Sequence, residues 1–406
     1  MLALPKFIYF TIFYLLFLTT ADIYFGRISI LPIAPTQFAV LMLVPIAGLL
    51  IMKDFFHQPK LLKVAYIIKN NSPLILSYFA VVVVSLLFSL LPGAYWEEGA
   101  RWIFLINYGF IIFFFSMFLP MIKVVRSKYS FFLFSALLVI FSTIVYELYQ
   151  PGFFSTVQAR AAGLPGNSNL SALVIAFICA AALRYDIEKS KIYDSLVLVV
   201  AGLSIFFTLS RSGLIEFFVI FLSYLCFAIF SSKKRLTFSP KRFLGLLFFL
   251  AIIATFFLTV IPKVIEESNL FTSGSAQSRL GLLSGRGGVE DASGESRYKA
   301  ILESLELINE SPIVGHGTAH SRQMKELPHN MYLNQWVNNG ILGLSCYVVF
   351  LITSFMTFRK RKFVPGQVFV LVAVVGSFFS HNVLDHRPFL ILFGMMATLS
   401  LPKEKV

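Results

Sequence analysis

The chain has 406 residues, of which 57% are hydrophobic and 13% are charged. Its mean hydropathy of +0.80 lies far above that of a soluble globular protein, so the composition excludes a soluble enzyme and predicts a polytopic membrane protein. The net charge of +14 comes from basic residues in short runs between apolar segments, a pattern typical of membrane topology and not of nucleic-acid binding. The three cysteines lie inside apolar runs and have no metal-ligand spacing.

Apolar segments long enough to cross a bilayer, about 20 residues each, recur along the chain and predict an all-α protein with about twelve transmembrane helices. The expected spans are residues 7–21, 30–52, 73–91, 101–119, 130–150, 168–185, 193–209, 213–230, 243–262, 331–357, 366–380 and 386–402. We therefore expect nine spans in residues 1–262, a long loop carrying the catalytic segment in 263–330, and three spans in 331–406.

The basic residues of the connecting segments predict which side of the membrane each segment faces. One alternate set of connections holds 22 of the 34 lysines and arginines, and we assign it to the cytoplasm together with both termini. The short connections of the other set hold Arg27, Arg101, Arg160, Arg211 and Arg387. These arginines and the long loop are therefore expected on the opposite face, which is periplasmic in a bacterium.

The long loop contains a helical pattern after a segment rich in Gly and Ser. From Glu295 to Asn309, apolar residues repeat at helical spacing between charged ones, and Pro312 follows. The apolar positions are Tyr298, Ile301, Leu302, Leu305 and Ile308. This pattern predicts one amphipathic helix that lies on the bilayer or against the other helices.

Pro328 precedes His329 and an apolar helix follows it, so the imidazole is expected at a helix N-terminus, where the helix dipole disfavours its charged form. A neutral imidazole near the membrane surface can accept a proton from a sugar hydroxyl. Asn330 can cap the helix or orient the ring. The alternative is that His329 is only a polar residue at the membrane boundary.

Two further histidines, His316 and His320, lie in a glycine-rich turn upstream of His329 and raise the question of a metal site. Spacings of four and nine residues, with Glu326 as the one nearby carboxylate, argue against it. We therefore expect no metal ion and no other cofactor.

Two arginines at the outward ends of spans are candidates for binding phosphate. Arg211, in the segment SRSG, is costly at this depth unless it is paired or faces a polar cavity, and its guanidinium matches phosphate oxygens. The alternative is that Glu216 is its internal partner. Arg160 lies in a turn before Asn167 and Asn169, whose amides suit sugars, and the alternative for it is a solvated arginine in a turn.

The long loop offers further arginines, and the last outward turn offers one carboxylate. Arg297 is best placed, because the start of the amphipathic helix itself favours phosphate, and Arg286 competes with it as an anion ligand. Asp385 is expected either to orient His329 or to pair with Arg387. The chain contains no Asp-x-Asp, P-loop or Gly-x-Ser-x-Gly motif, which weakens the case for nucleotide-sugar, ATP or serine-hydrolase chemistry.

Together these segments resemble the shared signature of the O-antigen ligase/polymerase family. The motifs are Arg297, Gly315-His-Gly317, His329-Asn330-x-x-Leu333 and Gly340-x-x-Gly343, with SRSG at 210–213 and R-x-x-G…N-x-N at 160–169 upstream. The resemblance implies a glycosyltransferase C-like membrane fold. It also implies transfer of a glycan from undecaprenyl diphosphate to a hydroxyl acceptor, without a metal, at the periplasmic face of the bacterial inner membrane.

Carried over onto the matching positions, the resemblance makes His329 the base on the acceptor hydroxyl. Arg211, with Arg160 or Arg297, would bind the diphosphate leaving group, whose developing charge guanidinium groups can stabilise in a low-dielectric pocket. The remaining expected substrate-binding residues are Asn330, Asp385 and Arg286. Attack opposite the leaving group predicts inversion at the anomeric carbon.

The favoured hypothesis from the sequence is a ligase, whose acceptor is a sugar of lipid A–core. The nearest alternative is an O-antigen polymerase, which has the same donor and uses another O-unit as acceptor. A third is a transporter that binds an anionic lipid-linked glycan without chemistry, although no inverted repeat is visible in the sequence. A relative that glycosylates teichoic acid or protein is a fourth. The expected partners are the lipid-linked donor, the lipid acceptor and the bilayer, with no nucleic acid.

Overall fold

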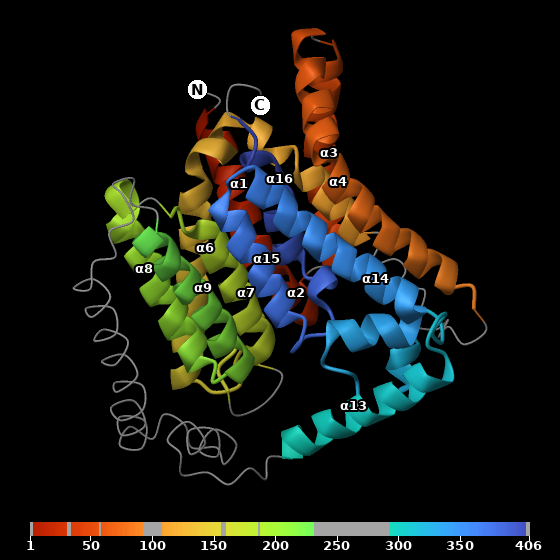
Figure 1. Ribbon diagram of the computed structural model, residues 1–406. Helices are drawn as coiled ribbons and strands as arrows, with labels where there is room; N and C mark the ends of the chain where they lie inside the picture. Colours follow the sequence, from red (N-terminus) through yellow and green to blue (C-terminus); the bar gives the residue numbers. More distant parts are fainter. Residues whose placement is uncertain are drawn as a thin grey trace.

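A computed structural model describes residues 3–30, 34–56, 58–91, 108–155, 160–185, 187–230 and 292–402. The regular structure of these ranges is helical throughout and includes no strand, as Figure 1 shows. The elements are α1 (Ala3–Leu18), α2 (Ala21–Arg27), α3 (Pro35–Phe56), α4 (Gln58–Phe88), η1 (Leu119–Met121), α6 (Lys123–Tyr149), α7 (Ser168–Ala182), α8 (Ile187–Phe207), α9 (Arg211–Phe230), α13 (Ala292–Glu310), η3 (His320–Gln323), α14 (Met331–Lys360), α15 (Val364–Gly376), η4 (Val383–Asp385) and α16 (Arg387–Leu399).

The lengths and apolar character of these helices agree with an all-α membrane protein. In the described ranges, four helices are long and apolar enough to cross a membrane, and α1 and α2 form a fifth candidate that is bent by 70°. Five further apolar helices are shorter. The described part of each expected span contains a helix. Residues 31–33 and 101–107 of two expected spans, and the whole expected span at 243–262, lie outside the described residues.

The start of α4 differs most from the sequence-based boundary. The sequence predicts a span only from residue 73, with a charged connection before it, but α4 begins at Gln58 and continues through Pro73. Lysine is a good helix former, so the charged stretch extends the helix instead of ending it. The part that meets the criterion for a membrane span runs from Lys63 to Phe88.

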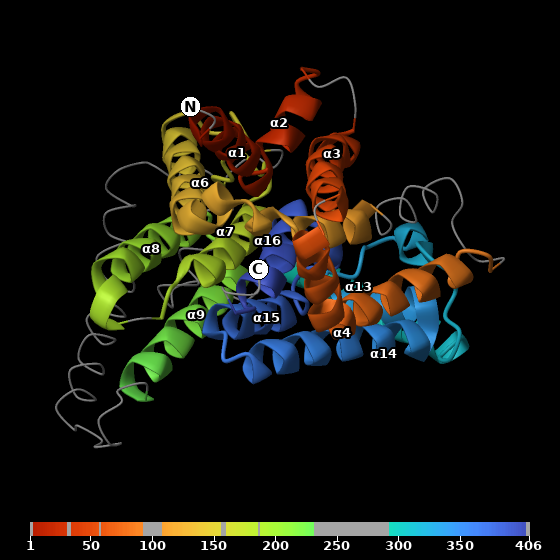
Figure 2. The ribbon, with the colours of Figure 1, turned by 90° about the horizontal axis from the view of Figure 1, so that it is seen from above.

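The helix α7 lies at the centre of the bundle and is buried along almost its whole length. It packs against α6, α8, α9, α15 and α16, an arrangement that can be followed in Figure 2. Its sequence is rich in Ala and Ser, and such small residues allow helices to approach closely in membranes. The contact with α9 is the closest example, because a Cβ on Gly213 would lie 2.4 Å from the Cβ of Ala172.

The helix α14 is broken near its middle. Gly340 has a φ of +61° and Asn339 also lies outside the helical region, so the helix that fills the expected span 331–357 is kinked at this point, which the sequence does not predict. A positive φ is costly for residues other than glycine, which explains why position 340, at the break, is a glycine. The break frees backbone N–H and C=O groups, and these need new partners inside a membrane protein.

The loop ahead of α14 supplies those partners. Backbone hydrogen bonds run from His316 to Val337 (2.9 Å), from Gly317 to Asn338 (2.9 Å) and from Ile341 to Pro312 (3.0 Å), the donor named first. The two backbones touch at glycines: a Cβ on Gly315 would lie 2.4 Å from the nitrogen of Gly340, and a Cβ on Gly340 would lie 2.0 Å from the carbonyl oxygen of Ile313. Both positions therefore require glycine.

The helix α13 crosses the end of the bundle opposite to the one where α1 begins and α16 ends (Figure 1). Its bounds, Ala292–Glu310, agree closely with the predicted amphipathic helix. It packs against α14 with a narrow side formed by Ala300, Ser304 and Ile308, which are one helical turn apart. Of the five apolar residues predicted to share one face, only Ile308 is buried, because the others point away from α14.

The contact between the loop and the broken helix gives a stability prediction. Gly340→Ala should lower the free energy of unfolding by about 2 kcal/mol or more, since the new methyl group meets a backbone oxygen and the φ is positive. The measurement is the thermal unfolding midpoint of the purified protein in detergent. Gly48→Ala in α3 is the matched control, because a Cβ there has no neighbour within 4 Å. Equal midpoints for the two variants would contradict this account of the break.

Candidate functional site

A pocket of about 620 Å³ opens beside His329. Its walls come from the starts of α7 and α9, from His329 just ahead of the cap of α14, and from the turn between α15 and α16. The lining residues are Asn167, Asn169, Leu170, Leu173, Ser212, Glu216, His329, Phe379, Ser380, His381, Asn382 and His386. Segments that are far apart in the sequence thus meet around one imidazole, at helix ends where polar side chains are tolerated.

His329 keeps access to solvent while its ring borders the pocket. Burial lowers the pKa of this imidazole from 6.5, the positive charge of Arg297 lowers it further, and Glu326 opposes the shift. His329 is therefore neutral at physiological pH and able to accept a proton. The sequence predicts the same direction from the helix dipole, but burial and Arg297 are the causes in the structure. Arg297 is half-buried in α13, and its charge acts directly on the histidine.

His381 is a second imidazole at the site, which the sequence analysis passes over. Its ring centroid lies 5.6 Å from that of His329. Burial and the nearby charge of Arg322 lower the pKa of His381 to about 3, with smaller contributions from His329 and His386. Its Nδ1 atom is buried and has no hydrogen-bond partner in the described part of the chain. The signal available from the sequence was its place in the same outward turn as Asp385.

A second pocket, of about 460 Å³, lies on the other side of His381. It is lined by the polar face of the first half of α14 together with η3 and η4; the polar members are Thr318, Ser321, Arg322, Asn334, Gln335, Asn338, Asn339, His381 and Asp385. Asp385 belongs to this pocket and not to the one beside His329. Burial raises the pKa of Asp385 to about 7, and Arg322 opposes the shift.

Arg160 is held near the start of α7 by a loop that is folded around Glu147. The buried carboxylate of Glu147 accepts hydrogen bonds from four backbone N–H groups: those of Phe154 (3.2 Å), Ser155 (2.6 Å), Ala162 (2.7 Å) and Gly163 (2.7 Å). Arg160 itself is half-buried and donates to Oδ1 of Asn169 at 3.3 Å. It is therefore not simply a solvated residue in a turn, and Glu147 is a positioning residue that the sequence analysis missed.

Asn169 also connects this loop to the start of α9. Its Oδ1 atom accepts a second hydrogen bond from the hydroxyl of Ser210 at 3.1 Å. Arg211 follows as the first residue of α9 and is exposed, while Ser212 lines the pocket. The arginine-bearing segments at 160 and 211 are thus joined through one amide. Glu216, the alternative partner for Arg211, lies buried in the pocket wall.

Asn330 is the N-cap of α14. Its Oδ1 atom accepts from the backbone N–H groups of Tyr332 (2.9 Å) and Leu333 (3.1 Å). Of the two roles that the sequence allows, the structure gives it the capping role. The cap fixes the first turn of α14 and, with it, His329, which directly precedes the cap residue.

The other histidines of the loop have a structural role. The Nε2 atom of His316 lies 2.7 Å from the carbonyl oxygen of Leu307, and the rings of His316 and His320 are stacked with centroids 4.7 Å apart. Within the described ranges, no group of three or more His, Cys, Asp or Glu side chains is arranged to hold a metal ion. Arg286, a predicted substrate-binding residue, lies outside the described residues.

Residues 196–348 match the family model described as O-antigen ligase. The chain carries an O-antigen ligase family domain. The family comprises glycosyltransferase-like membrane enzymes of lipopolysaccharide synthesis, ligases and polymerases alike, that act on lipid-linked glycans. No curated protein matches the chain as a relative.

The O-antigen ligase domain contains much of the site but not all of it. Arg211, Glu216, Arg297 and His329 lie inside the matched segment, as do the glycines at the break in α14. The loop that carries Arg160 and the turn with His381 lie outside it. Helices before and after the O-antigen ligase domain therefore complete the pocket.

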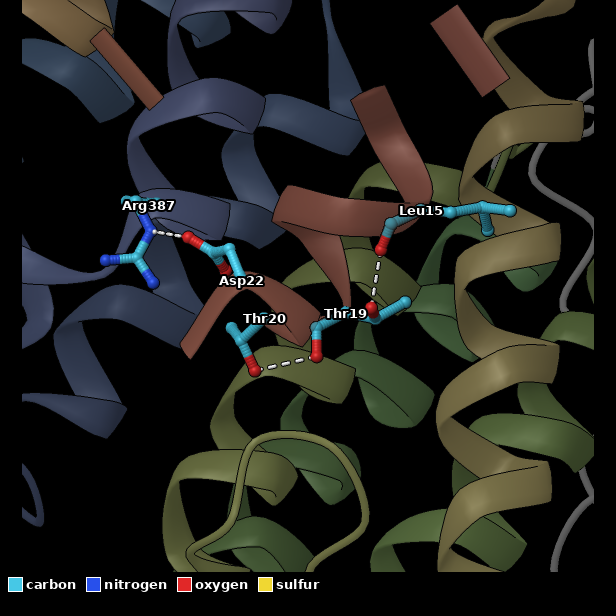
Figure 3. A network of polar contacts seen from close by, with 5 residues as sticks. All are labelled: Leu15, Thr19, Thr20, Asp22 and Arg387. Carbon is cyan, nitrogen blue, oxygen red and sulfur yellow. Dashed lines mark hydrogen bonds and ion pairs between the residues drawn. The ribbon is translucent and has the colours of Figure 1, made fainter. Parts of the chain in front are cut away.

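A buried ion pair fixes one of those flanking helices. The Nε atom of Arg387, at the start of α16, lies 2.8 Å from Oδ2 of Asp22, and both side chains are buried (Figure 3). Asp22 belongs to α2, which is set at an angle by the bend at Thr19 and Thr20. The sequence suggests Asp385 as a partner for Arg387, but in the structure Arg387 pairs with Asp22. Buried charges are tolerated when they are paired, and this pair joins the first bent span to the last helix.

The ion pair yields a double-variant prediction. Asp22→Asn should destabilise the protein by about 3–5 kcal/mol, because it removes the carboxylate that pairs with a buried guanidinium. The combined variant Asp22→Leu/Arg387→Met should recover most of that loss, since it removes both charges. Thermal unfolding in detergent measures both. A double variant that is less stable than Asp22→Asn alone would contradict the account of a charge pair that is costly mainly when broken.

Proposed function

We propose that the protein is an O-antigen ligase that transfers O-antigen polysaccharide from undecaprenyl diphosphate to a sugar hydroxyl of lipid A–core. The reaction takes place at the periplasmic face of the inner membrane. One observation carries the proposal: within an O-antigen ligase domain, an imidazole that its surroundings keep neutral borders a pocket lined by amides, hydroxyls and a carboxyl group. That is the arrangement a base needs to meet a sugar hydroxyl.

In the proposed reaction His329 accepts the proton of the acceptor hydroxyl as the oxygen attacks the anomeric carbon. The bond from that carbon to the diphosphate breaks, and its electron pair leaves with the phosphate oxygen. Attack and departure on opposite faces invert the anomeric configuration. Arg211, with Arg160 or Arg297, neutralises the charge of the leaving diphosphate. These guanidinium groups do what a divalent metal ion does in other glycosyltransferases. Arg286 is a further candidate for this role.

The proposed topology places both termini in the cytoplasm and the site in the periplasm. The bias of 22 basic residues against five supports it, and so does Figure 1, where α1 begins and α16 ends away from α13. In this topology about twelve spans are divided by one long periplasmic loop, with nine spans in 1–262 and three in 331–406. The donor lipid stays in the bilayer while its diphosphate reaches the outward arginines.

The proposed function is tested in a deletion strain complemented with variants of this chain. Wild-type protein should restore the ladder of long O-antigen on lipopolysaccharide gels, and His329→Ala should leave unsubstituted lipid A–core although the protein inserts normally. Asn338→Ala, in the second pocket, controls for loss of a polar residue near the turn. Core that carries a single O-unit in the deletion strain would identify a polymerase instead. A full ladder with His329→Ala would refute the role of His329 as the base and would favour a transporter.

The lowered pKa of His329 predicts the pH dependence of transfer. A base acts when it is deprotonated, so the rate should be constant above its pKa and should fall only below about pH 6.5, the ordinary value for histidine. Arg297→Gln removes a charge that lowers this pKa, so its acidic limb should move to higher pH when each profile is scaled to its own plateau. Arg359→Gln, far along α14, is the control for loss of one positive charge. An acidic limb that stays in place or moves to lower pH would contradict the claim that the charge of Arg297 lowers the pKa of His329.

A further inference from the structure

The lining of the pocket beside His329 has a distinct chemical character. Apart from its imidazoles, its polar members are the amides of Asn167, Asn169 and Asn382, the hydroxyls of Ser212 and Ser380, and the carboxyl group of Glu216. Among the residues that the structure describes, the lining includes no lysine or arginine. The guanidinium of Arg160 bonds to a lining amide but is not itself part of the lining. Such a surface suits a neutral, polyhydroxylated ligand and not an anion.

Glu216 is the most unusual member of this lining. It lies in the second turn of α9 and is 2% exposed, yet its Oε2 atom has no hydrogen-bond partner in the described part of the chain. A buried carboxyl oxygen without a partner is costly, so its presence in a pocket wall indicates that a ligand supplies the missing bond. Gly376 of α15 packs closely against it, because a Cβ there would lie 3.4 Å from Oε1 of Glu216.

The two amides at the start of α7 are complementary to this carboxyl group. The Oδ1 atom of Asn167 caps the helix by accepting from two backbone N–H groups. The Oδ1 atom of Asn169 accepts from Arg160 and Ser210. What each asparagine can offer a ligand is therefore its NH₂ group, a donor. A sugar ring carries hydroxyls that both donate and accept, so it matches a carboxyl acceptor and amide donors at once.

We propose that the pocket binds an uncharged sugar ring of the acceptor and that Glu216 accepts a hydrogen bond from one of its hydroxyls while a second hydroxyl faces His329. The diphosphate of the donor then lies outside the pocket, toward the arginines, because the described lining holds no lysine or arginine that would bind an anion. This assignment rests on the proposed glycan transfer and divides its two substrates between two subsites.

The test is the steady-state kinetics of the full chain, purified in detergent. The acceptor is lipid A–core from a strain that lacks this protein, and the donor is the undecaprenyl-diphosphate-linked glycan of the same strain. Each is varied while the other is saturating. We expect Glu216→Ala to raise the acceptor KM by about 10- to 100-fold and Glu216→Gln by about 3- to 10-fold, the range for one lost or weakened hydrogen bond. The donor KM and the acidic limb of the pH profile should be unchanged.

Ser223→Ala is the matched control, because this serine is on the same helix and, among the described residues, its hydroxyl donates to the carbonyl of Val219 in that helix at 2.7 Å. Its acceptor KM should equal that of the wild type. Glu216→Gln preserves side-chain volume, so it carries the test if Glu216→Ala unfolds. A wild-type acceptor KM in Glu216→Gln overturns the proposal.

Two other results would also overturn the subsite assignment. A rise in the donor KM alone would place the donor in the pocket. A large fall in kcat together with loss of the acidic limb of the pH profile would indicate that Glu216 acts as a base and not as a sugar ligand. Absence of transfer by the wild-type protein would refute the proposed function itself, whereas transfer that is indifferent to Glu216 would refute only this inference.

Discussion

The position of His329 depends on how the protein satisfies the backbone groups that are freed in the middle of α14. The preceding loop bonds to them, and it can do so only because Gly315 and Gly340 let two stretches of backbone come into contact. The start of the helix is fixed independently by the cap of Asn330 and by the N–H of Met331, which donates to a backbone carbonyl at the end of α15. The segment that ends in His329 is thus anchored on both sides, and the glycines of the family motif serve this geometry.

The rest of the site is assembled by single buried polar groups that each join distant segments. Glu147 organises the loop before α7 through four backbone hydrogen bonds. Asn169 links Arg160 to the start of α9, and the pair of Asp22 with Arg387 ties the first bent span to the last helix. Such groups are costly when unsatisfied, so they specify one arrangement of otherwise interchangeable apolar helices. The pocket follows from these contacts, since its walls are the helix ends that they hold together.

The sequence predicts those features that depend on local pattern. Runs of apolar residues locate the described spans, helical spacing locates α13, and Pro328 followed by an apolar run places His329 at a helix start. Features that depend on distant partners could not be predicted. The break at Gly340 needs a loop to bond to the freed groups, and α4 extends because lysines are compatible with a helix. Of the candidate site, the sequence predicts His329 from its place before an apolar helix and the arginines from their expected outward positions, whereas His381 and Glu216 gain meaning only from the pocket they share.

The central claim is that the protein keeps the His329 imidazole neutral beside a sugar-binding pocket. The most direct measurement is a ¹⁵N NMR titration of histidine-labelled protein in detergent, with His329→Gln used to assign the resonance among the six histidines. We expect a pKa clearly below 6.5 that rises toward that value in Arg297→Gln, because burial and the guanidinium both disfavour the charged ring. A pKa at or above 6.5 in the wild-type protein would contradict the claim, since neither burial nor the guanidinium of Arg297 would then be disfavouring the charged ring.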